Sequence, residues 1–329
     1  MNRFLELDLN EMPFPPPENV IRAAEKSLGN LNRYADAESL QRLRLLLSEY
    51  AGVDYEQIII GPGSDLLLRE IVLCFAARRK VLMADPTFLP TALVARRFAR
   101  KLVHIRLTPP LYCLALQALV EELDEPSLII IDNPNNPTGK LLLDREAVEN
   151  ILDYADTLLV VDEAYCEFSG LTLAGMVSNH ANLAVTRTLD KAFGLAGARI
   201  GYLIAGRGFL DAFPVSSSFL PKASLEAAIE ALLRPGYMWR NVQSIVRERE
   251  RLCEQLTALG ATVFPSSANF LLVRSQITAL AEELRDRGVL VKDISDQLGP
   301  GFIRVAVGMP QENDAFLEAY RSTKKRSFS

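Results

Sequence analysis

The stretch LIIIDNPNNPTG, residues 128–139, joins a short apolar run to a loop of asparagines and prolines. Continuous apolar runs of this kind are typical of strands that are buried on both faces of a parallel sheet. Similar runs recur before and after it, and helical patterns separate them. We therefore predict an α/β fold whose large domain has three αβα layers around a mostly parallel, seven-stranded sheet. The predicted strands are residues 57–60, 81–84, 102–105, 128–131, 158–161, 183–186 and 200–205.

Five helical patterns accompany these strands: one precedes the first strand, at residues 40–51, and four lie between strands, at residues 66–77, 91–100, 113–122 and 145–154. From about Gly206 the pattern changes to that of a smaller α+β domain, which includes a long charged amphipathic helix over residues 241–259. A proline-rich segment near the N-terminus excludes regular helix there. We predict an N-terminal arm of residues 1–30 associated with the small domain, a large domain of residues 31–205 and a small domain of residues 206–329.

Composition limits the function classes. The chain has 329 residues, of which 49% are hydrophobic and 23% are charged, and this balance is ordinary for a globular protein. A net charge of −5 does not favour nucleic acid or an anionic membrane as a partner. Four scattered cysteines and two histidines give no disulfide framework, and we expect no metal. Without a leader pattern or an apolar run of 18 residues, the expected location is the cytoplasm.

Polar segments follow four of the predicted strands, at the edge where parallel sheets bind their ligands. The segment at residues 61–65 supplies glycines and a serine at a helix start, a pattern that suits a phosphate but also suits a simple turn. In residues 133–139, two prolines hold the asparagine amides in a rigid loop, which favours binding. The other two segments carry Asp162 and, after the strand at 183–186, Lys191 with Arg199 beyond it.

Asp162 ends an apolar strand, where its charge needs a partner such as a protonated ring nitrogen or a helix N-terminus. Lys191 has two readings: a surface lysine in a glycine-rich loop, or a nucleophile toward carbonyls whose pKa is lowered beside Arg199. Together, the four segments supply a phosphate cradle, an amine that reacts with aldehydes and a carboxylate for a ring nitrogen. This combination matches the chemistry of pyridoxal 5′-phosphate.

The chain resembles the fold-type I pyridoxal-phosphate aminotransferases over nearly its whole length, and within them the histidinol-phosphate aminotransferase branch. Residues 9–14 (LNEMPF) and 30–34 (NLNRY) are similar to two motifs of that branch, although Ala35 replaces a proline. Residues 133–139 (NPNNPTG), 162–165 (DEAY) and 191–201 (KAFGLAGARIG) match the superfamily closely. Two departures are Asp190, where the branch has Ser or Thr, and residues 216–222, which differ from its Pro-Tyr-Asn-Val-Asn pattern.

The resemblance implies Lys191, Asp162 and Tyr165 as catalytic residues. Lys191 would bond to the cofactor and carry the substrate proton, Asp162 would keep the ring nitrogen protonated, and Tyr165 would hold the ring hydroxyl together with Asn136. Phe88 would stack on the ring. The residues implied for the phosphate are Gly63, Ser64, Asp65, Thr188 and Arg199, with Tyr34 reaching it from the other subunit of a homodimer.

Arg304 matches the arginine that grips the substrate anion, and a charge within an apolar strand independently suggests an anionic partner. Asn10, Phe14 and Asn269 are further candidate substrate contacts. Asp190 is expected to weaken cofactor binding, because an ionised carboxylate adds like charge beside a phosphate.

The activity implied is exchange of an amino group between a small-molecule amino donor and a 2-oxo acid, with histidinol phosphate and 2-oxoglutarate of histidine biosynthesis as the favoured pair. A threonine-phosphate decarboxylase and an aromatic amino-acid aminotransferase on the same scaffold are alternatives. A non-catalytic binding module that retains the fold is a rival from another class. The joint presence of Lys191, Asp162, Tyr165 and Arg199 disfavours that rival. A nucleotide-binding dehydrogenase is disfavoured because no GxGxxG follows a first strand.

Overall fold

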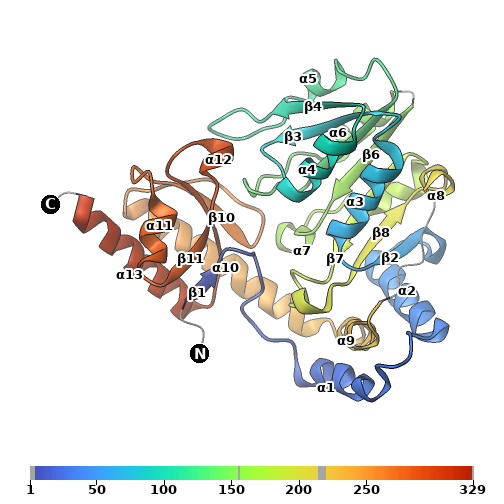
Figure 1. Ribbon diagram of the computed structural model, residues 1–329, viewed down its shortest axis with the longest axis horizontal. Coiled ribbons are helices and arrows are strands. Elements are labelled where there is room, and N and C mark those ends of the chain that lie inside the picture. The colour runs from blue at the N-terminus through green and yellow to red at the C-terminus, as the bar shows by residue number, and fades with distance from the viewer. Residues whose placement is uncertain (1–3, 155, 214–219, 328–329) are drawn as a thin grey trace.

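The computed structural model describes residues 4–154, 156–213 and 220–327, except for the side chains of residues 325–327. Two sheets organise these residues (Figure 1). The larger sheet has seven strands in the order β2-β8-β7-β6-β5-β3-β4, and β8 runs antiparallel to both of its neighbours. The mostly parallel seven-stranded sheet is therefore confirmed. Its strands are β2 (Ile58–Gly61), β3 (Lys80–Asp85), β4 (Lys101–Arg106), β5 (Ser127–Asp132), β6 (Thr157–Asp162), β7 (Leu183–Thr188) and β8 (Gly201–Ala205).

Helices cover both faces of this sheet because its strands are apolar on both sides. In β5, Leu128 and Ile130 pack into one core cluster while Ile129 and Ile131 pack into the other. The first cluster contains side chains of α3 (Ser64–Phe75), α4 (Leu89–Phe98) and α8 (Arg207–Ala212). The second contains side chains of α2 (Ala37–Ala51), α5 (Leu116–Val120), α6 (Arg145–Leu152) and α9 (Lys222–Leu233). The predicted three layers are confirmed.

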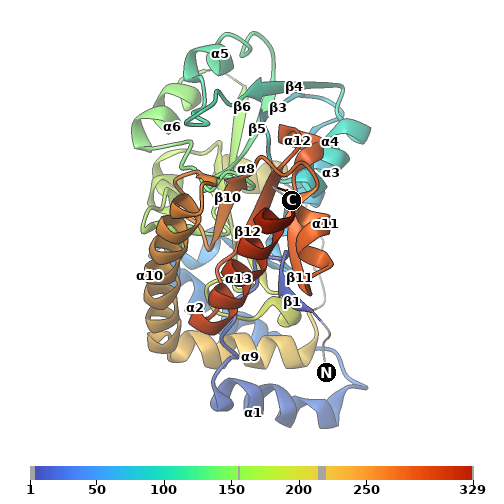
Figure 2. The same ribbon diagram turned by 90° about the vertical axis from the view of Figure 1, so that its left-hand side faces the viewer.

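The smaller sheet has the order β1-β11-β12-β10-β9. Helices α10 (Gly236–Ala258), α11 (Leu280–Arg285) and α13 (Pro310–Ser327) contribute to its own apolar cluster. Figure 2 shows α10 along one side of the molecule, with α13 in front of the small sheet. The strands are β1 (Leu5–Leu7), β9 (Thr262–Val263), β10 (Phe270–Arg274), β11 (Val289–Asp293) and β12 (Phe302–Ala306), and α12 (Ser295–Leu298) lies between the last two.

The N-terminal arm carries two elements that the sequence did not predict. Strand β1 pairs in parallel with β11 at the edge of the small sheet, and α1 (Glu18–Ser27) packs beside α9 (Figures 1 and 2). Since α9 also packs on α2, the domain boundary near residue 206 stays a prediction. No described helix is both long and apolar enough to span a membrane.

Two predicted helices have different bounds. Helix α5 is shorter than the predicted 113–122, because Cys113 pairs with Thr108 in an isolated β-bridge. Helix α10 begins at Gly236, earlier than predicted, directly after Pro235. The departure at residues 216–222 falls partly outside the described residues, since 216–219 are not among them. Short 3-10 helices occupy Leu28–Asn30, Tyr55–Gln57, Ala174–Asn179 and Ala196–Ala198, and α7 spans Cys166–Ser169.

Candidate active site

The carboxyl ends of β5, β6 and β7 bring polar side chains to one place. Asp132 is in register with Asp162, and Asp162 with Thr186. Side chains alternate along each strand, so these three and Thr188 face the side of the sheet covered by α3. Helix α3 begins at Ser64 on that same side. The sheet therefore places two carboxyl groups and several hydroxyls beside a helix N-terminus.

A cavity of about 400 Å³ opens at this edge. Its lining comes from the large sheet, from α4 and from the small sheet, so both parts of the molecule build it. Most of the predicted site residues line this cavity: Asn10, Ser64, Asp65, Phe88, Asn136, Asp162, Tyr165, Thr188, Lys191, Arg199 and Arg304.

Four predicted residues lie outside the described lining. Gly63 lies beneath Arg199, where a Cβ would come within 2.4 Å of the guanidinium. Asn269 is buried and donates from Nδ2 to the backbone carbonyl of Asn10 at 3.0 Å, so it supports a lining residue from behind. Phe14 packs against the apolar core of the large domain, and the side chain of Tyr34 is 76% exposed. The roles predicted for these four stay predictions.

Lys191 projects its Nζ toward the N-terminal arm and donates to the carbonyl oxygen of Leu9 at 3.0 Å. Burial, together with the nearby charge of Arg304, lowers the pKa of Lys191 to about 8, although Asp190 opposes the change. A larger share of the amine is therefore neutral near pH 7 than for an ordinary lysine. A neutral amine is the form that attacks a carbonyl.

Asp162 accepts a hydrogen bond from the Thr186 hydroxyl at 2.8 Å. Burial raises its pKa to about 7, and the carboxyl of Asp132 adds to the shift. A cationic ring nitrogen beside Asp162 would favour the ionised form and reverse this shift. Asp162 is thus suited to hold a protonated heterocycle.

Asp132 is a site residue that the sequence reasoning missed. Its carboxyl accepts from the Thr87 hydroxyl at 2.8 Å, from Asn135 Nδ2 at 3.1 Å and from the backbone N–H of Asn136 at 2.6 Å. Burial raises the pKa of Asp132 to about 6. These bonds fix the loop after β5 and hold Asn136 at the cavity. The sequence pattern that could have identified Asp132 is a carboxylate at the end of an apolar strand. The same pattern identified Asp162.

Two cations reach the cavity from the small sheet. Arg304 donates from Nη1 to Asn136 Oδ1 at 2.6 Å and from Nη2 to the carbonyl of Asp8, while its buried Nε has no hydrogen-bond partner among the described residues. Lys292 is directly opposite Arg304 in the β11–β12 register and lines the same cavity. The sequence did not single out Lys292, because a lysine near the end of a short strand is ordinarily solvated.

A further group of polar residues surrounds the N-terminus of α3. We call Ser64, Thr188, Asp190 and Arg199 the Arg199 corner. Asp190 and Arg199 form an ion pair in which the Asp190 side chain is 7% exposed and the Arg199 side chain is 48% exposed. All four residues line the cavity. The corner thus offers the Ser64 hydroxyl and a guanidinium to an anion, while the Thr188 hydroxyl donates to the carbonyl of Ile200 at 3.1 Å. It also already contains a carboxylate.

The family model for aminotransferase class I and II matches residues 2–319. The chain belongs to this family. It is 35% identical to a histidinol-phosphate aminotransferase of Thermococcus kodakarensis over 324 residues, which cover 97% of this chain and 92% of the relative. The predicted family, fold and aminotransferase class are therefore confirmed.

Solved structures agree with this assignment. A histidinol-phosphate aminotransferase from Sinorhizobium meliloti in complex with pyridoxal-5′-phosphate is 27% identical, with a TM-score of 0.84 and coverage of 98% of this chain and 91% of that one. An L-threonine-O-3-phosphate decarboxylase from Porphyromonas gingivalis has a TM-score of 0.81 at 22% identity, covering 97% and 99% of the two chains. The second likeness shows a shared fold alone.

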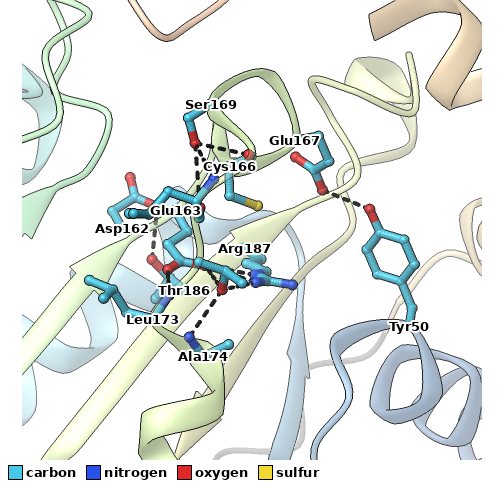
Figure 3. Close-up of polar contacts among 12 residues, drawn as sticks. Tyr50, Asp162, Glu163, Cys166, Glu167, Ser169, Leu173, Ala174, Thr186 and Arg187 are labelled. Carbon is cyan, nitrogen blue, oxygen red and sulfur yellow. Dashed lines mark hydrogen bonds and ion pairs between the residues drawn. The ribbon is translucent and has the colours of Figure 1, made fainter. Parts of the chain in front are cut away.

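Behind the cavity, this aminotransferase contains a buried ion pair. Arg187 Nε and Nη2 both donate to Glu163 Oε2 at 2.9 Å, and both side chains are almost fully buried. Glu163 also accepts from the Thr172 hydroxyl at 2.8 Å and from the backbone N–H of Leu173 at 2.5 Å (Figure 3). The ion pair therefore joins the ends of β6 and β7 on the face opposite Asp162 and Thr186.

Proposed function

We propose that this aminotransferase uses pyridoxal 5′-phosphate and transfers an amino group from histidinol phosphate to 2-oxoglutarate. The donor set of the cavity fits the cofactor at each of its polar groups. Lys191 is an amine with a lowered pKa, Asp162 is a buried carboxyl, and the Arg199 corner surrounds a helix N-terminus. Gly63 also fits, since its backbone has a positive φ of 86° and a side chain there would require the Arg199 guanidinium to move.

Bound pyridoxal phosphate supplies an aldehyde that reacts with amines and a ring that accepts electrons. The protein supplies the acid–base groups. Asp162 keeps a proton on the ring nitrogen. Lys191 Nζ would move a proton between the amino-bearing carbon of the donor and the cofactor carbon that carries the aldehyde, and would reverse this transfer with the acceptor, a role that suits a pKa of about 8. Asn136 and Tyr165, which line the same cavity, would hold the ring hydroxyl.

The proposed substrates are inferred from the pair of cations on the small sheet. Arg304 and Lys292 are cross-strand neighbours that line one cavity with Asn136 and Phe88. Two adjacent positive charges suit a phosphate or a dicarboxylate better than a neutral side chain. Histidinol phosphate and 2-oxoglutarate both meet this requirement. An aromatic amino acid, by contrast, would leave one of the cations without an anionic partner.

The experiment is a single-turnover panel of amino donors. Purified enzyme with bound cofactor is mixed with histidinol phosphate, threonine phosphate, glutamate or an aromatic amino acid, and the long-wavelength band of the lysine-bound cofactor is followed. Rapid loss of the band with histidinol phosphate, and glutamate formation when 2-oxoglutarate follows, would support the proposal. Carbon dioxide release from threonine phosphate would instead identify a decarboxylase.

Arg304→Lys is expected to reduce kcat/KM roughly ten- to a hundred-fold, because a charge-assisted hydrogen bond contributes about 1.5–3 kcal/mol and lysine lacks the planar fork. Activity toward histidinol phosphate and 2-oxoglutarate should fall together, since one arginine serves both. Steady-state kinetics with each substrate measures this. Cofactor absorbance should survive, because Arg199 serves the cofactor phosphate. If the variant loses cofactor but reacts normally with substrate, Arg304 binds the cofactor phosphate and not the substrate anion.

We further propose a homodimer in which Tyr34, exposed in the single chain, completes the neighbouring site. Mixing inactive Lys191→Ala with weakened Tyr34→Phe should then restore part of the activity. One site of each hybrid would carry both lesions and the other neither. The recovered activity is measured after subunit exchange has been verified by mass spectrometry. Failure to recover activity in an exchanged mixture would show that each site is built within one chain.

A further inference from the structure

The Arg199 corner contains a carboxylate where an anion is to bind. Asp190 Oδ2 is ion-paired with Arg199, whereas Asp190 Oδ1 is buried and has no hydrogen-bond partner among the described residues. The side chain does not point into solvent, since it is 93% buried. An incoming phosphate therefore meets a guanidinium that is already occupied and a carboxylate oxygen that repels it.

Two cations and one hydroxyl lie next to Asp190. Arg199 lies across the corner, Lys191 follows it in the chain, and the Thr188 hydroxyl accepts from its backbone N–H at 3.1 Å. Asp65, at the start of α3, lines the same cavity but is paired with Arg69 at 3.0 Å. Burial raises the pKa of Asp190, while Arg199 and Lys191 oppose the shift. Two nearby cations thus stabilise the ionised form of this buried carboxylate.

We propose that anion binding in the Arg199 corner is linked to a proton: the phosphate takes Arg199 from Asp190, and Asp190 takes up a proton from solvent. The carboxylate loses its cation and gains a negative neighbour, and both changes favour its neutral form. Once protonated, Asp190 carries an O–H that can donate toward the phosphate, which replaces repulsion by a hydrogen bond. This inference rests on the proposed function, because it takes the cofactor phosphate as the anion.

Linkage fixes the direction of the pH effect. When binding takes up one proton, the binding constant falls up to about tenfold for each unit of pH increase. Phosphate esters also titrate, near pH 6. That contribution is shared by all variants and cancels when their dissociation constants are compared at one pH. The ratio of wild type to an uncharged variant at residue 190 therefore isolates the carboxylate.

The test uses the full chain without cofactor, and pyridoxamine 5′-phosphate as the probe. This probe carries the phosphate but has no aldehyde, so covalent chemistry at Lys191 does not contribute. Dissociation constants are measured by calorimetry at pH 6.5, 7.5 and 8.5, in buffers of low and high ionisation enthalpy, which gives the number of protons taken up. Asp190→Asn removes the charge at constant shape, and Asp190→Ser offers a hydroxyl. Asp65→Asn is the matched control, and pyridoxamine without phosphate is the control ligand.

On binding the probe, wild type and Asp65→Asn should take up more protons than Asp190→Asn and Asp190→Ser. The difference should approach one proton. Asp190→Ser should bind the probe at least about tenfold more tightly than wild type at pH 8.5, and this advantage should shrink at pH 6.5. Pyridoxamine should show no such difference. Equal proton uptake in all variants, or a constant ratio across pH, would overturn the inference while leaving the proposed cofactor intact. Failure of every variant to bind the probe would overturn both.

Discussion

Lys191→Ala should abolish borohydride-trapped attachment of pyridoxal 5′-phosphate and lower turnover by several orders of magnitude. The amine lies at the cavity beyond β7, its pKa is lowered to about 8, and the other lysine of the described lining, Lys292, stands on the small sheet. Two of its functions are thus lost with one side chain. The measurements are mass spectrometry of the reduced, digested protein and kcat with the best donor of the panel.

Lys292→Ala is the matched control for this prediction. Lys292 lines the same cavity but stands on the small sheet opposite Arg304. Its removal should leave cofactor labelling intact and should weaken only the binding of the substrate anion. Lys140 and Lys222 lie outside the described lining of the cavity, and Lys222 is paired with Asp36 at 3.4 Å. Labelling that persists in Lys191→Ala would transfer the covalent role to one of these three lysines.

Glu163→Gln should lower the free energy of unfolding by about 3–5 kcal/mol, because removal of one partner of a buried pair leaves an uncompensated charge. Arg187 would keep its hydrogen bond to the Thr172 hydroxyl but lose the carboxylate that accepts from both Nε and Nη2, in a buried place. Urea unfolding of the cofactor-free protein, followed by circular dichroism, measures the loss. The double variant Glu163→Gln/Arg187→Gln should recover part of it, since the buried guanidinium is then removed. The recovery is only partial because the buried Glu167 loses the same nearby cation.

An exposed pair provides the comparison. Arg207 and Asp211 are paired at 3.0 Å on α8, with side chains that are 83% and 61% exposed. Asp211→Asn should change stability by less than about 1 kcal/mol, because solvent screens such a pair. If Glu163→Gln were as mild as Asp211→Asn, the ion pair behind the site would not hold β6 and β7 together in the way described.

Much of the large domain could be predicted because its strands are apolar on both faces. The continuous apolar run at 128–131 predicts that β5 lies inside a parallel sheet with helices on both faces. The polar loop that follows it then indicates the edge of the sheet where the site lies. The chemistry of Lys191 and Asp162 could be inferred from residue type and position. The hydrogen bond from Arg304 to Asn136 in the same cavity could not, because Arg304 comes from a different sheet and only the packing of the two parts brings it there.

The residues that were missed share a physical cause. Strand β1 is three residues long and has a charge at its centre, so its place depends on pairing with β11 rather than on its own pattern. From the sequence, Lys292 is expected to be a solvated residue at the end of a strand. Only the β11–β12 register shows that it lies beside Arg304. Asp190 and Arg199 were both expected near the phosphate, but their ion pair depends on the turn between β7 and β8, where Arg199 adopts a left-handed backbone with φ of 53°. Cross-strand and loop contacts of this kind have no local signature.

The attachment of the N-terminal arm to the small sheet constrains how the molecule is made. Leu5 pairs with Val289, and Leu9 accepts the hydrogen bond from Lys191, so the arm's partners lie far along the chain. During synthesis, the arm emerges early and must wait until β11 has left the ribosome before it can pair. Contacts between such distant segments also make folding slow, because a long loop must close first. The large sheet can therefore form on a nascent chain. The part of the arm that accepts the Lys191 hydrogen bond reaches its place only after the small sheet has been translated.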